Sequence, residues 1–204
     1  MIEFETEWVR QNSPDPADPT LINWTERQAE AWIPFHLHGG RPVCPVLFPP
    51  GPRYGRNDMR LWGENKCADA LVTCTFNGVR YVLLVERADG LGWAMPGGGV
   101  EPGEVSLMTA WRELVEETGI TETVFASLNW KLDAPRWVPD PRGSMEAWAV
   151  TVVARCDLGT VDALPEVYPA DGENKNVRWI GVGYLGWLAD RIFPAHREIL
   201  GAGR

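Results

Sequence analysis

The segment Gly98–Ile120, which reads GGVEPGEVSLMTAWRELVEETGI, constrains this chain more than any other part of its sequence. Its apolar residues recur at three- and four-residue steps and share one face of a helix: Leu107, Ala110, Trp111 and Leu114. Gly119 follows them, and glycine commonly ends a helix because it adopts the left-handed conformation without side-chain strain. The spacing therefore predicts a helix from about residue 105 to residue 118.

Three acidic residues of this helix share another face. Glu113, Glu116 and Glu117 are related as i, i+3 and i+4, so their carboxylates emerge together. Like charges this close repel one another, and a divalent cation offsets that repulsion. Clustered carboxylate oxygens suit Mg²⁺ or Mn²⁺. The alternative is an acidic helix face that only contacts solvent.

The complete spacing G-x5-E-x7-R-E-L-x-E-E-x-G-I resembles, position for position, the signature of the Nudix hydrolases. With average residue frequencies, a chance match in a chain of this length is on the order of 10⁻⁷. The resemblance implies an α/β/α sandwich and metal-dependent cleavage of a nucleoside diphosphate linked to another group. It also implies the catalytic set Glu104, Arg112, Glu113, Glu116 and Glu117.

The loop before the helix carries three glycines, Gly97, Gly98 and Gly99, whose missing side chains let the backbone approach a metal or a phosphate. The resemblance implies that the carbonyl of Gly97 is a metal ligand, together with Glu113, Glu116 and Glu117. Arg112 is interpreted as an orienting residue that pairs with Glu104 or Glu113. The alternatives are an ordinary helix arginine and, for Gly99, a structural turn.

Composition narrows the classes of partner. The chain has 204 residues and a net charge of −9, without a basic stripe, which argues against duplex nucleic acid or an anionic membrane as partner. No signal peptide, transit peptide or long apolar run is visible. The cysteines show no C-x-x-C pairing, so we expect mostly buried thiols in a cytoplasmic protein: Cys44, Cys67, Cys74 and Cys156. His36 and His38 are interpreted as a local feature, not a zinc site.

The pattern of elements predicts one α/β domain of residues 61–204, a mixed sheet with helices on both sides, behind an irregular extension of residues 1–60. The extension is rich in proline, glycine and tryptophan, and only residues 25–32 look helical. Asn77-Gly78 predicts a hairpin turn. Strands are predicted over residues 70–76, 79–86, 93–95, 122–132, 146–156 and 177–182, and a final helix, disturbed at Pro194, over residues 184–200.

Four further segments, in the same order, resemble one subfamily, the mitochondrial-type ADP-ribose pyrophosphatases and the related ADP-ribose-binding domain of a cation channel. LWGENKCADALVT resembles RWGPNHAADPIIT, and GWAMPGGGVEPGE resembles EWAIPGGMVDPGE. DPR followed by AW resembles D-P-R-N-T-D-N-A-W, and ADGENKNVRWI resembles AGDDAGKVKWV. Together they cover roughly residues 40–180.

The chain departs from the subfamily at several positions. Glu64 and Lys66 stand where the subfamily has Pro and His, and Glu146 stands where Asn is usual. The segment 172–174 reads GEN in place of DDA, and the insertion after the signature helix is shorter. These departures concern substrate preference and leave the hydrolytic chemistry unchanged.

The subfamily resemblance implies that Asp140 and Arg142 contact ADP-ribose, since an arginine fork grips phosphate and an aspartate accepts from ribose hydroxyls. The alternative is a turn with a local Asp–Arg pair. Asn65 and Asp69 precede the first core strand and are candidates for the ribose or adenine pocket; turn hydrogen bonds are the alternative.

Glu173 or Asp171 is a candidate for a carboxylate outside the signature helix, acting as a further ligand or base; an exposed loop acid is the alternative. Trp137 and Trp148 could stack on adenine, but alternation along residues 146–156 favours core packing.

We therefore predict an enzyme that hydrolyses ADP-ribose to AMP and ribose 5-phosphate with Mg²⁺ or Mn²⁺. Its partner is a small nucleoside diphosphate substrate, and a monomer is slightly favoured over a homodimer. One alternative is another Nudix substrate: NADH, a dinucleoside polyphosphate, a nucleotide sugar or an oxidised nucleoside triphosphate. The other is a non-catalytic ADP-ribose sensor, which the intact acids of the signature disfavour.

Overall fold

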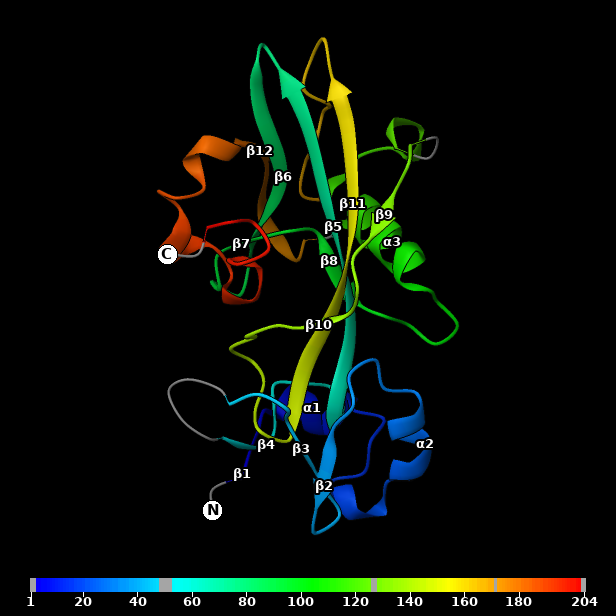
Figure 1. The fold of residues 1–204 in the computed structure, drawn as a ribbon. Coiled ribbons are helices and arrows are strands. Elements are labelled where there is room, and N and C mark those ends of the chain that lie inside the picture. Colours follow the sequence, from blue (N-terminus) through cyan, green and yellow to red (C-terminus); the bar gives the residue numbers. More distant parts are fainter. Residues whose placement is uncertain (1–2, 48–52, 126–127, 171, 203–204) are drawn as a thin grey trace. The chain divides into compact units, whose positions relative to one another are not determined.

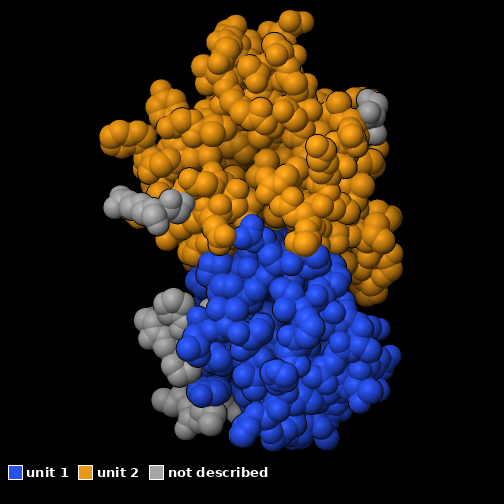
Figure 2. All heavy atoms as spheres, viewed as in Figure 1, with its two compact units in different colours: residues 1–66, 135–151 blue, residues 67–134, 152–204 orange. Residues whose placement is uncertain are grey.

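The computed structural model describes residues 3–47, 53–125, 128–170 and 172–202 (Figure 1). The chain divides into two compact units (Figure 2). Residues 1–66 and 135–151 form unit 1, and residues 67–134 and 152–204 form unit 2. No described helix is long and apolar enough to cross a lipid bilayer.

The main sheet has eight strands in the central order β10-β11-β5-β6-β12, with β7 paired to β6, β8 to β5 and β9 to β11. Its strands are β5 Gly63–Phe76, β6 Val79–Arg87, β7 Trp93–Ala94, β8 Gly97–Gly99, β9 Lys131–Leu132, β10 Arg136–Trp137, β11 Ala147–Thr160 and β12 Asn174–Gly181. The predicted α/β class and five of the six predicted strands are therefore confirmed, with ends shifted by a few residues.

The hairpin between β5 and β6 turns at Asn77 and Gly78, as predicted. Both residues have positive φ angles, 48° and 77°. These angles match the turn type that joins two twisted strands through two residues, and Phe76 pairs with Val79 directly beside the turn. The local sequence therefore sets the register of the central pair of strands.

The signature helix α3 spans Ser106–Thr118, and the predicted helix is confirmed. Its Ala110 and Leu114 are fully buried, and Gly119 ends the helix in the left-handed conformation with φ 64°. Packing against Tyr168 also requires glycine at position 119, because a Cβ on Gly119 would lie 2.4 Å from the tyrosine ring. Within unit 2, α3 and the C-terminal segment lie on opposite sides of the long strands (Figure 1).

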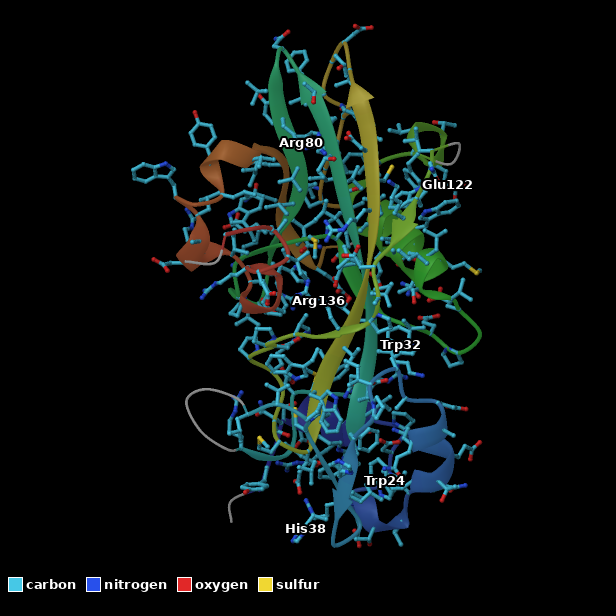
Figure 3. The ribbon with its side chains drawn as sticks, viewed as in Figure 1. Trp24, Trp32, His38, Arg80, Glu122 and Arg136 are labelled. Atoms are coloured by element: carbon cyan, nitrogen blue, oxygen red, sulfur yellow. The ribbon has the colours of Figure 1, made fainter. Side chains whose placement is uncertain are left out.

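The strand predicted over residues 122–132 is wrong in its first part. The 3-10 helix η2 spans Glu122–Val124 (Figure 3), and only the short β9 follows. The rings of Phe125 and Trp130 pack edge-on at 5.8 Å, and both contact Trp111 of α3. This aromatic cluster packs Phe125 and Trp130 against α3, and a 3-10 helix stands in place of the strand predicted over residues 122–124. Residues 126–127 of the predicted strand lie outside the described residues.

The helix predicted over residues 184–200 is also wrong. Three 3-10 helices replace it: η3 Val182–Tyr184, η4 Ala189–Arg191 and η5 Pro194–His196. The segment docks on β7, where Ile192 forms a bridge with Trp93 and the Phe193 amide donates to the Trp93 carbonyl at 2.8 Å. Backbone groups that pair with a strand cannot also form a continuous helix, and Pro194 has no amide hydrogen to contribute.

The core of unit 2 joins the sheet to this C-terminal segment. Residues from both parts form one buried cluster: Val82, Leu84, Trp93, Met95, Val153, Leu185, Ala189, Ile192 and Ala202. Unit 1 has a separate core made of Trp24, Phe35, Cys44, Trp62, Trp148 and Val150. Trp148 is fully buried and packs edge-on against Phe35 at 5.2 Å, so the prediction of a core role for Trp148 is confirmed.

Unit 1 is more regular than the sequence suggested. Its elements are β1 Glu3–Glu5, α1 Glu7–Asn12, η1 Pro19–Leu21, α2 Trp24–Ala29, β2 His36–His38, β3 Arg41–Val43 and β4 Tyr54–Asn57. The expectation of one helical stretch in an irregular extension is therefore wrong, because strand pairing (β1 with β4, β2 with β3) orders the segment. The assignment of residues 1–60 as an extension of a domain over residues 61–204 stays a prediction.

The helix predicted over residues 25–32 ends early, and Glu64 gives the reason. The carboxylate of Glu64 accepts hydrogen bonds from the amides of Trp32 and Ile33 at 2.8 and 2.9 Å (Figure 3). Those amides leave the helix to reach this buried acceptor. Trp62 lies between two guanidinium groups, Arg41 and Arg56, each 5.3 Å from its ring.

No disulfide joins the four cysteines, and Cys44, Cys74 and Cys156 are buried. Burial raises the pKa of the Cys44 and Cys156 thiols to about 11. We expect these two thiols to react with a disulfide reagent at pH 8 far more slowly than Cys67, which is partly exposed. Mass spectrometry of the labelled native protein measures this, and denatured protein, in which all four must react, is the control.

The raised pKa values of the Cys44 and Cys156 thiols also determine how the free energy of unfolding changes with pH. The folded state keeps these thiols neutral, so their contribution to stability is complete below an unfolded pKa of about 8.5 and is lost as pH rises through about 11. Equal labelling rates for buried and partly exposed cysteines in the native protein would contradict the burial described.

Candidate active site

Helix α3 carries the three predicted carboxylates at different depths. The Glu117 residue is 8% exposed, whereas the side chains of Glu113 and Glu116 are 16% and 54% exposed. The helical spacing places them on one side, while packing determines how far each reaches solvent. A gradient from a buried to an exposed carboxylate therefore runs along this face.

Arg112 holds the acids of the signature together. Its guanidinium donates to Glu104 at 2.9 Å, to Glu113 at 2.8 Å and to Glu116 at 3.1 Å. It also donates to the carbonyl of Gly99 at 3.3 Å. The sequence predicted Glu104 or Glu113 as its partner, and the structure shows both. One planar fork with five donors can satisfy several acceptors at once, which a lysine cannot do.

Glu104 is fixed by more than the arginine. Thr109 donates to its carboxylate at 2.7 Å, and the amide of Glu101 donates at 3.2 Å. Hydrogen bonds from Arg112 and then from Thr109 lower the pKa of Glu104 to about 2. Glu104 is therefore a permanent anion that fixes the position of Arg112.

Glu117 connects the helix to the glycine loop and to β12. Its Oε2 accepts from the amide of Gly97 at 2.9 Å, and its Oε1 accepts from the side chain of Asn174 at 3.0 Å. In the sequence, Asn174 stands out only as part of a departure from an acidic segment. Its contact with Glu117 was not predicted, because the strand that carries Asn174 lies far away in the sequence.

The glycine loop forms β8 and pairs with β5, so that Gly97 lies opposite Asp69. A Cβ on Gly98 would lie 2.2 Å from Oε1 of Glu113, and one on Gly97 would lie 2.2 Å from Oδ1 of Asp69. No atom lies within 4 Å of such a Cβ on Gly99. Two of the three glycines therefore lie against carboxylates with no space for a side chain, while the predicted approach of the loop to a metal or a phosphate stays a prediction.

The surroundings of Glu113 raise its pKa above the ordinary value, through opposing contributions. Burial raises the pKa of Glu113, the nearby charge and hydrogen bond of Arg112 oppose this, and the charges of Glu116 and Glu173 raise the pKa further. Glu173, a predicted carboxylate outside the helix, is therefore close enough to interact with Glu113. Its alternative, Asp171, lies outside the described residues.

The ligand atoms available at this site are of the chemical type that a hard divalent cation prefers. Glu113, Glu116, Glu117 and the backbone of the glycine loop offer oxygen only, and the acids need positive charge. Among the described residues, no three His, Cys, Asp or Glu side chains converge on one metal position. Arg112 and the amide of Gly97 hold the carboxylates apart, so binding a cation requires Glu113 and Glu116 to share or leave the arginine.

Three of the predicted substrate-binding residues make local hydrogen bonds. Asn65 bonds the amide and carbonyl of Leu61, both at 2.9 Å, and Arg142 pairs with Asp140 through a contact of 2.6 Å. These are the local turn contacts considered as alternatives, and all three polar residues belong to unit 1. Asp69, by contrast, lies in unit 2, where its Oδ1 is 3.3 Å from Nε2 of His196.

The departures from the subfamily have structural partners within unit 1. Glu64 binds the backbone after α2, and Lys66 donates to the carbonyl of Glu30 at 2.6 Å. Glu146 pairs with Arg41 and accepts from the amide of Gly55 at 2.7 Å. Glu64, Lys66 and Glu146 therefore each contact the N-terminal segment, whereas the departure at residues 172–174 lies in unit 2, where Asn174 contacts Glu117.

Comparison with known proteins decides the family. The NUDIX domain model matches residues 67–201, more than half of the chain. The chain belongs to the Nudix hydrolase family. The predicted fold is thereby confirmed as the α/β Nudix fold with a mixed sheet and few helices. As a Nudix hydrolase, it cleaves a pyrophosphate bond in a nucleoside diphosphate derivative.

Individual relatives of this Nudix hydrolase agree. A Caenorhabditis elegans protein named nudix hydrolase 6 is 28% identical over 209 residues, covering 89% of this chain and 80% of that protein. The crystal structure of a bifunctional NMN adenylyltransferase/ADP-ribose pyrophosphatase from Francisella tularensis, complexed with AMP and a manganese ion, is 29% identical with a TM-score of 0.56. The match covers 69% of this chain but only 41% of that chain.

A third relative shows the fold alone. The Ap4A hydrolase of C. elegans, crystallised as a binary complex, is 20% identical with a TM-score of 0.53, and the match covers 68% of this chain and 93% of that one. Nudix hydrolases typically use a divalent metal, and the manganese in the Francisella structure is consistent with this.

The two loop glycines provide a matched test of the site of this Nudix hydrolase. Gly98→Ala places a methyl group against the Glu113 carboxylate, whereas Gly99→Ala meets no neighbour. We expect the first change to lower kcat about 10-fold or more by moving Glu113, and the second to leave kcat within about 2-fold. Steady-state kinetics of both variants measures this. Equal activity of the two would show that Glu113 has no role at its present position.

The pKa of Glu104 gives a second test. We expect its carboxylate to stay ionised until pH falls to about 2, and Arg112→Gln to move the pKa up towards the ordinary value near 4.3. Because the folded pKa is depressed, the stability gained is complete above that ordinary value and is lost as pH falls through about 2. Carbon-detected NMR titration of the glutamate carboxyls measures both pKa values. A wild-type pKa near 4 would contradict the bonds described.

Proposed function

We propose that this Nudix hydrolase cleaves ADP-ribose to AMP and ribose 5-phosphate. The observation that supports it most is the set of Glu113, Glu116 and Glu117 against the glycine loop, in a chain whose signature is intact. The choice of ADP-ribose rests on two supports. One is the 29% identity to a protein named as an ADP-ribose pyrophosphatase, and the other is the resemblance of four sequence segments outside the signature helix.

In this proposal Glu113, Glu116, Glu117 and the Gly97 carbonyl hold Mg²⁺ or Mn²⁺. When bound, the cation neutralises the charge that builds up on the pyrophosphate oxygens. Arg112, fixed by Glu104, orients Glu113 and Glu116 and limits their repulsion. A carboxylate of the site accepts the proton of the water that attacks phosphorus, and the P–O bond to the departing phosphate breaks.

The substrate-binding roles of Asp140, Arg142, Asn65, Asp69 and Glu173 are part of the proposal. Arg142 and Asp140 have the chemistry to grip a phosphate and a ribose hydroxyl, provided that their mutual pair opens or is shared. The predicted cytoplasmic location and monomeric state stay predictions.

A substrate panel with two matched glutamate variants tests the function. With Mg²⁺, we expect the wild type to release AMP and ribose 5-phosphate from ADP-ribose faster than it cleaves NADH, a dinucleoside polyphosphate or a nucleotide sugar. Glu117→Gln should lower kcat by about 10²–10³-fold, the loss typical of one key electrostatic group. Glu122→Gln removes the same charge at the exposed start of η2 (Figure 3) and should change little.

Product chromatography distinguishes the outcomes. Faster cleavage of another compound in the panel would identify that compound, and not ADP-ribose, as the preferred substrate. It would not contradict the proposed metal site. Tight calorimetric binding of ADP-ribose without AMP release would indicate a sensor. Near-normal turnover of Glu117→Gln with Mg²⁺ would contradict the assignment of the acids.

A further inference from the structure

The C-terminal segment places one buried histidine beside the glycine loop of unit 2. His196, the last residue of η5, is 5% exposed. The ring of Phe193 packs against it edge-on, with 5.2 Å between centroids and 86° between planes. This contact fixes the plane of the imidazole, so that its two nitrogens point in set directions.

The hydrogen bonds of His196 define its tautomer. Nδ1 accepts from the amide of Met95 at 3.0 Å, so this nitrogen carries no proton. The neutral ring therefore carries its hydrogen on Nε2, which lies 3.3 Å from Oδ1 of Asp69. One side chain thus accepts from the Met95 amide, just before Pro96, and places Nε2 beside a carboxylate on β5.

That carboxylate lies directly over Gly97. Asp69 pairs with Gly97 between β5 and β8, and its Oδ1 occupies the space that a Cβ on Gly97 would need. The next contact leads to the signature helix, because the Gly97 amide donates to Glu117 at 2.9 Å. His196 therefore lies 3.3 Å from Asp69, Asp69 packs against Gly97, and the Gly97 amide bonds Glu117, so these contacts connect the histidine to the signature helix.

We propose that His196 is a positioning residue of the active site, acting through Met95 and Asp69 on the orientation of the Gly97 carbonyl. It holds the backbone on both sides of Pro96, directly at Met95 and through the Asp69 carboxylate at Gly97. Restraint of the backbone at Met95 and at Gly97 limits the torsion angles that Gly97 can adopt, and with them the direction of its carbonyl. The inference rests on the proposed role of that carbonyl as a metal ligand.

Such a role is reasonable in magnitude. Outer residues that orient metal ligands typically change metal affinity or activity by about 10–100-fold when they are replaced. His196 meets the geometric condition for this, since it contacts the ligand-bearing segment without belonging to it. A lone histidine near the chain end gave no sequence signal for this role, because its partners lie more than a hundred residues earlier.

Graded substitutions separate the two contacts. His196→Asn keeps an acceptor near the position of Nδ1 and loses the donor, whereas His196→Gln keeps a donor near Nε2 and loses the acceptor. His196→Phe keeps the bulk and loses both. We expect the Kd for Mn²⁺, measured by electron paramagnetic resonance without substrate, to rise about 10–100-fold in His196→Phe and less in Asn and Gln. In the same variants kcat should fall more than KM rises.

Leu185→Ala is the matched control for lost stability. Leu185 belongs to the same buried cluster and is 4% exposed, but it is not part of the glycine loop or its polar contacts. We expect Leu185→Ala to lower the melting temperature while leaving the Kd for Mn²⁺ unchanged. Hydrogen exchange of the metal-free protein adds a readout independent of activity, in which the Met95 amide should exchange faster in His196→Phe and stay protected in His196→Asn.

The outcomes separate this inference from the proposed function. A wild type that binds Mn²⁺ while His196→Phe binds it equally well overturns the positioning role alone. Equal weakening of Mn²⁺ binding in Leu185→Ala also overturns it, because general stability then explains the loss. A wild type that binds no Mn²⁺ overturns both. Cleavage of a substrate other than ADP-ribose changes the proposed function but not this inference, which is measured by metal affinity and exchange.

Discussion

Repulsion among the carboxylates of α3 is the constraint on which the rest of the site depends. Arg112 answers it with one guanidinium that binds Glu104, Glu113 and Glu116. Glu104 is in turn held as an anion by the arginine and a threonine, so the arginine cannot leave its place freely. The carboxylates of the signature are therefore held in place by hydrogen bonds within the protein.

Unit 2 surrounds this helix with contacts from distant parts of the chain. Asn174 of β12 and the amide of Gly97 bind the two oxygens of Glu117. His196 of the C-terminal segment accepts a hydrogen bond from the amide of Met95, two residues before the glycine loop. Gly97 and Gly98 have no room for a side chain because carboxylates occupy that room. Gly97 and Gly98 are therefore required by packing against acidic side chains, and not only by the backbone conformation of a turn.

Unit 1 shows how departures from a subfamily pattern can be explained by local structure. Glu64, Lys66 and Glu146 each bind a backbone group or an arginine of the N-terminal segment. These residues therefore replace the subfamily pattern with contacts to Glu30, Ile33 and Arg41 of this chain. A substitution at a position where relatives have a binding residue need not change ligand binding, because the new side chain can instead contact a different neighbour within the same fold.

The sequence by itself determined the signature helix, its glycine end, the hairpin at Asn77-Gly78 and the identity of the acidic residues, because all of these depend on spacing over a few residues. It did not determine the C-terminal 3-10 turns, the 3-10 helix over residues 122–124 or the contacts of Glu117 with Asn174 and of His196 with Asp69. Those depend on which strand a segment meets, and such pairings join residues far apart in the chain. Local propensity is silent there, and tertiary packing decides.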